Sequence, residues 1–278
     1  MSQGTTILLG AIAGATIFLG LPVARLGNLS KAVQGFLNAL ATGILVFLLW
    51  DVLSKATEPV DRALVQVHRG EVAPFAALVA LFLGGVALGL MSLVYFNRRL
   101  SARLRAVSPR GLEGPGAAVA AEASALPSSR ALALMIAVGL GLHNLSEGLA
   151  IGQAAATGAI AFAGVLVIGF ALHNVTEGFG IAAPMATDAE RPSWGFLGLA
   201  GLVGGGPTFV GTVIGYRATS DYLFVLFLTL AAGALIYVIG EMLHVGRRMN
   251  APVMLGWGLF LGFAAGYGTD LLLTYLGS

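Results

Sequence analysis

Two near-identical strings of seven residues carry the side chains of this sequence that could do chemistry. The first runs from His143 to Leu149 and reads HNLSEGL, and the second runs from His173 to Phe179 and reads HNVTEGF. Each string lies within an otherwise apolar stretch. An ionisable group at membrane depth costs about 2.5–3.5 kcal/mol even on lenient insertion scales, so such groups mark a pathway or a binding site. We therefore place the functional site in these two strings.

The spacing within each string brings its polar side chains together. His and Glu are four residues apart, so they lie one turn apart on the same helix face, with Asn beside them. The candidate ligands are His143, Asn144, Glu147, His173, Asn174 and Glu177. If two antiparallel helices turn near residues 157–159, His143 comes level with Glu177, and Glu147 comes level with His173. Six ligating side chains then converge near the middle of the membrane.

The residue types predict the class of ligand. Imidazole and carboxylate without sulfur suit Zn(II), Fe(II), Mn(II) and similar divalent ions. The chain contains no cysteine, which excludes a thiolate site and makes copper(I) a poor candidate. Two carboxylates also offset much of the charge of a dehydrated dication. Because the ligands must be deprotonated to bind, we expect the affinity for metal to fall at acid pH.

The composition predicts the elements that position these strings. Of the 278 residues, 57% are hydrophobic and only 10% are charged, far less charge than the surface of a soluble domain needs. A helix of about 20 apolar residues crosses a bilayer. Eight stretches qualify, near residues 5–24, 33–54, 73–97, 131–154, 158–183, 194–216, 221–244 and 253–275. The sequence therefore predicts an all-α polytopic protein of eight transmembrane helices, forming one domain over residues 1–278.

The basic residues predict the orientation in the cell (inner) membrane. Most of the 15 Lys and Arg residues fall in one set of alternate loops, which places both termini outside the cytoplasm. Residues 98–130, rich in Arg, Ala, Gly, Ser and Pro, indicate a flexible cytoplasmic loop between helices three and four. This loop and the close tandem of helices four and five suggest a 3+2+3 arrangement with an inverted repeat. The formal charge of +2 gives no signal of nucleic-acid binding.

The doublet HNxxEG, on the fourth and fifth of eight predicted helices, resembles the signature of the ZIP (Zrt-, Irt-like) divalent metal transporters, in particular bacterial members. The helix count, the outside termini and the third loop agree with this family. The resemblance implies a primary metal site lined by His143, Glu147 and Glu177, with the other candidate ligands contributing to it or to an adjacent site. It implies that the metal is a transported substrate that moves toward the cytoplasm, and not a catalytic cofactor. Zinc is the first candidate for this metal, followed by iron, manganese and cadmium.

The sequence departs from the family pattern at two places. Ser146 and Thr176 stand where the motifs usually carry Pro, and their hydroxyls can bond back to a helix carbonyl. On helix six the run Gly204–Gly206 precedes Pro207, and Gly206 stands where many bacterial members carry Glu. A second metal ion would lose a carboxylate, so we expect a single-metal site. The glycine run could instead supply flexibility or a stretch lined by carbonyls.

Three further polar residues are candidates for a pathway. Glu241 and His244, at the cytoplasmic end of helix seven, could line an exit, or could be interfacial groups neutralised by Arg247 and Arg248. Asp51, near the outer end of helix two, could line an entrance, or could be a carboxylate in headgroup water.

Other functions remain open at this point. The His and Glu groups could serve as a proton relay for a carrier of an organic solute, or hold a metal that activates water in an intramembrane enzyme. The sequence has no HExxH string and no P-loop, so we expect no enzyme of the zinc-protease or ATPase kind. Buried His, Asn and Glu could also be a structural hydrogen-bonded network. A homodimer is one of the assemblies that the sequence leaves open.

Overall fold

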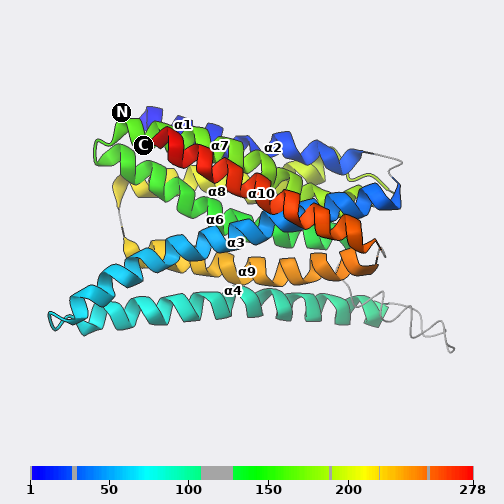
Figure 1. Cartoon of the computed structure of the whole chain (residues 1–278), viewed down its shortest axis with the longest axis horizontal. Helices are drawn as coiled ribbons and strands as arrows, with labels where there is room; N and C mark the ends of the chain where they lie inside the picture. The colour runs from blue at the N-terminus through cyan, green and yellow to red at the C-terminus, as the bar shows by residue number, and fades with distance from the viewer. Residues whose placement is uncertain are drawn as a thin grey trace.

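The computed structural model describes residues 2–26, 30–107, 128–187, 190–218, 220–248 and 251–277. Helices dominate these residues, and none of them forms a strand. The prediction of an all-α protein is confirmed. The long helices run roughly alongside one another in a bundle (Figure 1).

The N-terminal segment consists of α1 (Gln3–Ala15), α2 (Ile17–Gly20) and the 3-10 helix η1 (Leu21–Arg25). The remaining helices are α3 (Lys31–Val67), α4 (Val72–Val107), α6 (Ser129–Ala156), α7 (Ile160–Ala182) with the 3-10 helix η2 (Ala183–Thr187), α8 (Trp194–Arg217), α9 (Asp221–Arg248) and α10 (Pro252–Gly277). Seven segments of the described residues are long and apolar enough to cross a membrane. The eighth, α10, has 26 residues and packs along α3. The polytopic architecture is thus as predicted.

Local sequence fixes where several helices begin and where the chain turns. Ser30, Ser128 and Ser193 precede α3, α6 and α8, and each side chain accepts a hydrogen bond from the backbone N–H three residues later. Gly70 and Gly158 adopt positive φ angles of 91° and 84°, which glycine tolerates without strain. The turn at Gly158 joins α6 to α7 where the sequence predicted it.

The bundle has two distinct ends. Both chain termini and the turns at Gly70 and Gly158 lie at one end, called here the termini face (Figure 1). The other end, called the opposite face, carries Arg25 in η1 and the pair Arg247 and Arg248 in the last turn of α9. A residue near the middle of α6 or α7 therefore lies midway between the two faces.

Two helices are longer than predicted. α3 continues to Val67, because the extension has an apolar side on which Ala63 packs with Leu78 and Val225. α4 continues to Val107 and α6 begins at Ser129, so helix occupies both ends of the loop predicted over 98–130. The rest of that predicted loop, residues 108–127, lies outside the described residues.

The packing of the outer helices follows the pattern expected of an inverted repeat. α3 packs on α10, and α9 packs on α4. In each pair a glycine allows the backbones to touch, since a Cβ on Gly43 would overlap the carbonyl of Leu259 and one on Gly233 would overlap the carbonyl of Val86. Equivalent contacts thus recur in two helix pairs that run in opposite directions along the bundle.

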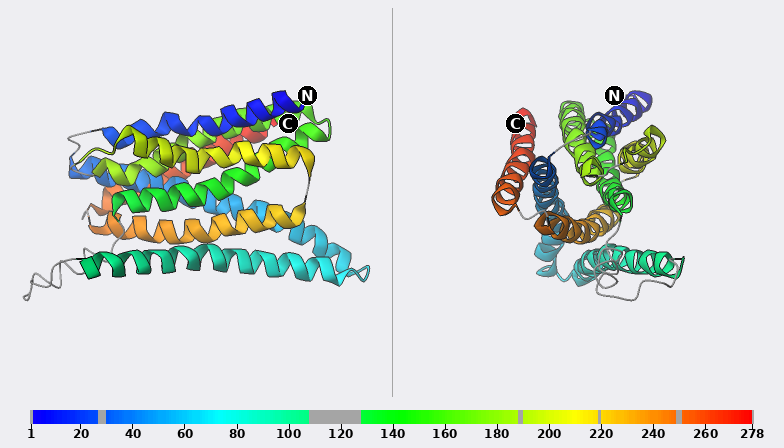
Figure 2. Two further views of the ribbon diagram at one scale, coloured as in Figure 1. Left: turned by 180° about the vertical axis from the view of Figure 1, so that it is seen from behind. Right: turned by 90° about the vertical axis from the view of Figure 1, so that its right-hand side faces the viewer.

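The helices fall into two groups by their contacts. One group contains α1, α2, α6, α7 and α8, and the other contains α3, α4, α9 and α10. The end-on view in Figure 2 shows the two groups beside each other. They meet mainly where α6 contacts α9 and where α7 contacts α10 and α3. The two motif strings belong to the first group and face this junction.

Candidate metal centre

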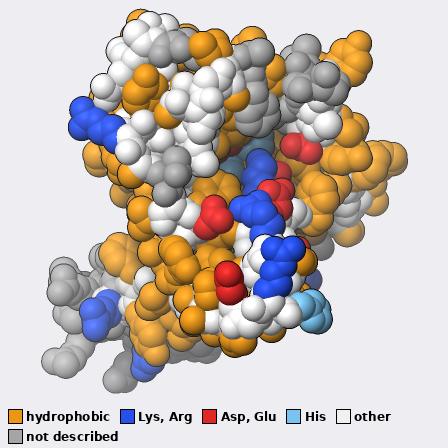
Figure 3. Space-filling view, turned by 90° about the vertical axis from the view of Figure 1, so that its left-hand side faces the viewer, with side chains coloured by type: hydrophobic (Ala, Val, Ile, Leu, Met, Phe, Trp, Pro, Cys, Tyr) orange, Lys and Arg blue, Asp and Glu red, His pale blue; other side chains and the backbone are white. Residues whose placement is uncertain are grey.

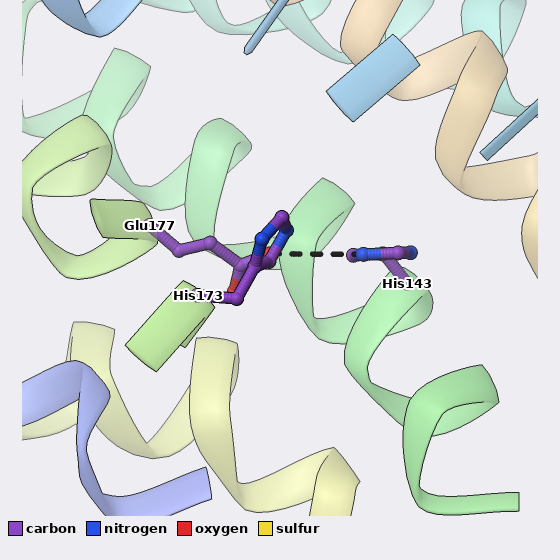
Figure 4. Close-up of side chains that lie close together, drawn as sticks. All are labelled: His143, His173 and Glu177. Carbon is purple, nitrogen blue, oxygen red and sulfur yellow. Dashed lines mark ion pairs between the residues drawn. The ribbon is translucent and has the colours of Figure 1, made fainter. Parts of the chain in front are cut away.

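The two motif histidines and one motif carboxylate come together between α6 and α7. Nε2 of His143 lies 3.8 Å from Oε1 of Glu177, and Nε2 of His173 lies 3.8 Å from the same oxygen (Figure 4). One ligand atom from each of the three residues lies within 4.8 Å of the others. This is the register in which His143 is level with Glu177.

Glu147 completes the cluster from the side of α6. Its Oε1 lies 3.4 Å from Nε2 of His143. We call His143, Glu147, His173 and Glu177 the motif centre. None of the four residues is more than 4% exposed, so they form a compact group of nitrogen and oxygen ligands away from bulk water.

Asn144 acts on the motif centre through Glu177. Its Nδ2 donates to Oε2 of Glu177 at 2.7 Å and to the carbonyl oxygen of Gly204 at 3.0 Å. One oxygen of Glu177 is therefore held by the amide, while the other faces the two histidines. The glycine run of α8 thus contributes a backbone carbonyl to the surroundings of the centre, which was one of the two roles considered for it.

Asn174 is engaged elsewhere, although it occupies the same place in the second string. Its Nδ2 donates to the carbonyl oxygen of Ala13 at 2.9 Å, which ties α7 to α1. The structure shows no hydrogen bond between Asn174 and a motif carboxylate among the described residues. Of the six predicted ligands, the four of the motif centre therefore lie together. Asn144 contacts this group through Glu177, and Asn174 does not.

Many polar atoms of the candidate ligands are buried without a hydrogen-bond partner among the residues that the structure describes. They are Nδ1 and Nε2 of His143, Oδ1 of Asn144, Oε2 of Glu147, Nε2 of His173, Oδ1 of Asn174 and Oε1 of Glu177. An unsatisfied buried polar group costs about 1–3 kcal/mol, so native proteins rarely gather several in one place. A network that served only to hold helices together would satisfy these atoms. A bound cation would satisfy several of them at once.

A cavity of about 610 Å³ reaches the motif centre. Its lining includes His143 and Glu147 at depth and Glu58 and Thr274 toward the ends of α3 and α10. Seen from the termini face, acidic and basic side chains gather around a hollow between the helix ends (Figure 3). The cavity thus opens toward the termini face and ends at the α6 side of the centre.

Asp51 lies deeper than a carboxylate in headgroup water would. It is 6% exposed, and its Oδ2 accepts a hydrogen bond from Nζ of Lys55 at 2.7 Å. Lys55, rather than Asp51, lines the cavity, together with Asp270 of α10. The sequence analysis did not consider Lys55 as part of a pathway. The spacing of Asp51 and Lys55, four residues apart in an apolar helix, was a signal for the ion pair.

Glu241 and His244 lie toward the opposite face and do not join the motif centre. Glu241 is half-buried beside the hydroxyl of Tyr237. His244 is exposed, near Arg247 and Arg248. Their role in an exit stays a prediction.

The hydroxyl residues in the two strings bond back to their own helices. Ser146 Oγ donates to the carbonyl oxygen of Leu142 at 3.4 Å, and Thr176 Oγ1 donates to that of His173 at 2.6 Å. Both α6 and α7 run unbroken through the motif. The ligands are therefore presented by continuous helices.

The motif glycines set how closely α6 and α7 approach their neighbours. A Cβ on Gly148 would overlap the carbonyl of Thr208 in α8, and one on Gly178 would overlap the carbonyl of Ile17 in α2. Gly211 and Gly20 make the reciprocal contacts from α8 and α2. Each motif helix is thus in direct backbone contact with one helix of its group.

Comparison with known proteins agrees with the resemblance seen in the sequence. The family model described as ZIP Zinc transporter matches residues 109–268, more than half of the chain and both motif strings. A search of curated proteins found no match.

Proposed function

Because this chain belongs to the ZIP zinc transporter family, we propose that it carries Zn²⁺, or a related divalent metal ion, into the cytoplasm through the motif centre. The family makes the substrate a divalent metal and the protein a membrane transporter. The observation that carries the finer proposal is the group of buried, unpartnered nitrogen and oxygen atoms on α6 and α7. An ion that replaces its hydration shell with these atoms would stabilise them all.

The ligand set favours borderline divalent ions. Two imidazoles and two carboxylates suit zinc, iron(II) and manganese(II), and the ligands bring two negative charges to a dication. Because Gly206 supplies no carboxylate, a second ion beside the first would lack charge compensation, and we infer a single-metal centre. Transport also requires the ion to leave, which favours a loose arrangement of ligands over a closed tetrahedral cage.

The charges at the two faces support the proposed direction of transport. The excess of Lys and Arg in the loops of the opposite face favours a cytoplasmic position for that face. The cavity then opens to the outside, and Glu58 and Asp270 on its wall attract cations toward the centre. We infer that the ion enters by this cavity and leaves past Glu241 when the helices around α6 and α7 change their packing.

The test is uptake of radioactive zinc by proteoliposomes that contain the purified protein. Glu147→Gln/Glu177→Gln keeps the size of both side chains and removes their charge. Glu71→Gln is the matched control, because Glu71 is exposed in the turn at the termini face. We expect the double variant, shown to be folded by its thermal unfolding, to lose uptake, and the control to keep it.

Two results would contradict the proposal. One is zinc uptake by the double variant at the rate of the wild-type protein, which would place the pathway elsewhere. The other is the absence of uptake of zinc, iron and manganese by well-folded wild-type protein. That second result would favour a proton-coupled carrier of an organic solute, the alternative left open by the sequence.

A further inference from the structure

The cavity that leads to the motif centre contains a positive charge of the chain itself. Among the described residues that line it, Lys55 is the only Lys or Arg, whereas Glu58, Glu147 and Asp270 are acidic. A lysine on the path of a cation is unexpected, because it repels the ion that the acidic residues attract. The position of Lys55 therefore needs an explanation beyond attraction of the substrate.

The ammonium group of Lys55 is held from several sides. Its Nζ lies 2.7 Å from Oδ2 of Asp51, one turn earlier on α3, and 5.9 Å from the ring centroid of Phe170 on α7. The carboxylates of Glu147 on α6 and Asp270 on α10 line the same cavity as this ammonium. Lys55 thus lies where four helices of the two groups meet at the cavity.

The environment of the pair indicates why the cation is present. Asp51 is buried and does not line the cavity, and its Oδ2 accepts the hydrogen bond from the ammonium. Glu147 lines the same cavity as Lys55, and its Oε2 has no hydrogen-bond partner among the described residues. Without metal, a buried carboxylate without a counter-charge is costly, and a nearby ammonium lowers that cost.

We propose that Lys55 is a tethered competitor of the transported ion. Its ammonium offsets the charge of Glu147 while the centre is empty, and it repels the dication that takes over this role. The centre therefore binds its substrate less tightly than its ligands alone would allow, which helps the ion to leave. This inference rests on the proposed function, since it assigns a role to Lys55 in metal transport through the motif centre.

The test compares equilibrium binding of Zn²⁺ to the purified full-length protein and its variants, by competition with a fluorescent chelator. Lys55→Met keeps the length of the side chain and removes the charge, and Lys55→Arg keeps the charge. We expect Lys55→Met to bind Zn²⁺ at least about tenfold more tightly than the wild type, because a repulsive charge close to the ion is gone. Lys55→Arg should bind within about threefold of the wild type.

A second variant controls for misfolding caused by a buried charge without a partner. Lys55→Met leaves Asp51 buried without its partner, so Asp51→Asn/Lys55→Met removes the whole ion pair. This double variant should also bind Zn²⁺ more tightly than the wild type, because Lys55 lines the cavity and Asp51 does not. In uptake assays, Lys55→Met and Asp51→Asn/Lys55→Met should both have a lower KM and a lower kcat than the wild type. A merely structural lysine would not produce that split.

The outcomes separate this inference from the proposed function. If the wild type binds Zn²⁺ and both charge-free variants bind it equally or more weakly, Lys55 is not a competitor and the inference is wrong. If neither the wild type nor any variant binds a divalent ion, the proposed function itself is wrong.

Discussion

The two copies of the motif share their residue types but have different surroundings. On α6, His143 and Glu147 line the cavity, and Asn144 binds Glu177 across the helix pair. On α7, Glu177 is fully buried and His173 is away from the cavity lining. The α6 copy thus faces the cavity, and the α7 copy lies on the buried side of the centre.

This difference shows that internal symmetry does not make the two strings equivalent. The packing of the outer helices obeys the inverted repeat, yet His143 and Glu147 of one string line the cavity, whereas His173 and Glu177 of the other do not. A site that must receive an ion from one side and release it to the other needs such an inequality in each conformation. The predictions that follow test how far the two copies differ, beginning with the largest expected effect.

The largest effect is expected when the carboxylates are compared singly. Loss of a residue that only supports a metal ligand weakens binding by about 10–100-fold. Glu177→Gln should weaken Zn²⁺ binding by more than this, because Glu177 lies within reach of both histidines. Glu147→Gln should weaken binding less, since among the described residues Glu147 forms an ion pair with one motif histidine, His143, and Glu177 with both. Chelator competition on the folded variants measures both. Equal losses would show that the two copies contribute alike.

Substitution of the two motif asparagines should affect different properties, namely Zn²⁺ binding for Asn144 and stability for Asn174. Asn144→Ala removes a donor to Glu177 and should weaken Zn²⁺ binding by about 10–100-fold. Asn174→Ala removes a bond to the backbone of α1 and should lower stability by about 1–3 kcal/mol, with binding changed by less than about threefold. Thermal unfolding in detergent and chelator competition, performed on both variants, distinguish the two results. A strong loss of binding in Asn174→Ala would make Asn174 a ligand.

The motif glycines should behave alike. Gly148→Ala and Gly178→Ala each place a methyl group against a backbone carbonyl of a neighbouring helix, and each should destabilise the protein by about 1–3 kcal/mol. Gly206→Ala is the control, because its Cβ would meet only the side chain of Leu202 at ordinary contact distance. Thermal unfolding measures all three. A normal Tm in Gly148→Ala would mean that α6 and α8 are less closely packed than described.

The pH dependence should not distinguish the two copies, because both supply a histidine and a carboxylate. The ligands of the motif centre must be free of protons to bind metal, so metal binding releases protons and affinity rises with pH. On lowering the pH below neutral, Zn²⁺ affinity should fall by up to about tenfold per pH unit for each proton displaced. Titrations at a series of pH values test this. A flat profile for the wild type would argue against carboxylate and imidazole ligands.

Local patterns in the sequence predicted much of the centre. The repeated spacing of His143 to Glu147 and of His173 to Glu177, with a turn near Gly158, was sufficient to set the register between the two helices. These relations depend on short stretches of chain, where helix geometry alone determines which side chains share a face.

The parts that were not predicted depend on long-range packing. No local pattern shows that Asn174 would meet a carbonyl of α1, or that Asp270 would share a cavity with Lys55. The length of α3 also depends on tertiary contacts, since Ala63 is covered only when α4 and α9 are in place. The sequence therefore predicted which side chains come together, but not which copy of the motif faces the cavity.

The backbone contacts at the motif glycines have a mechanical consequence. Where Gly148 touches Thr208 and Gly178 touches Ile17, no flexible side chain lies between the helices to absorb a small shift. α6 with α8, and α7 with the N-terminal segment, therefore behave as stiff pairs that resist sliding by a fraction of a turn. A displacement along the bundle would then move each string together with its own partner helix, past the less tightly joined surfaces of α3 and α9.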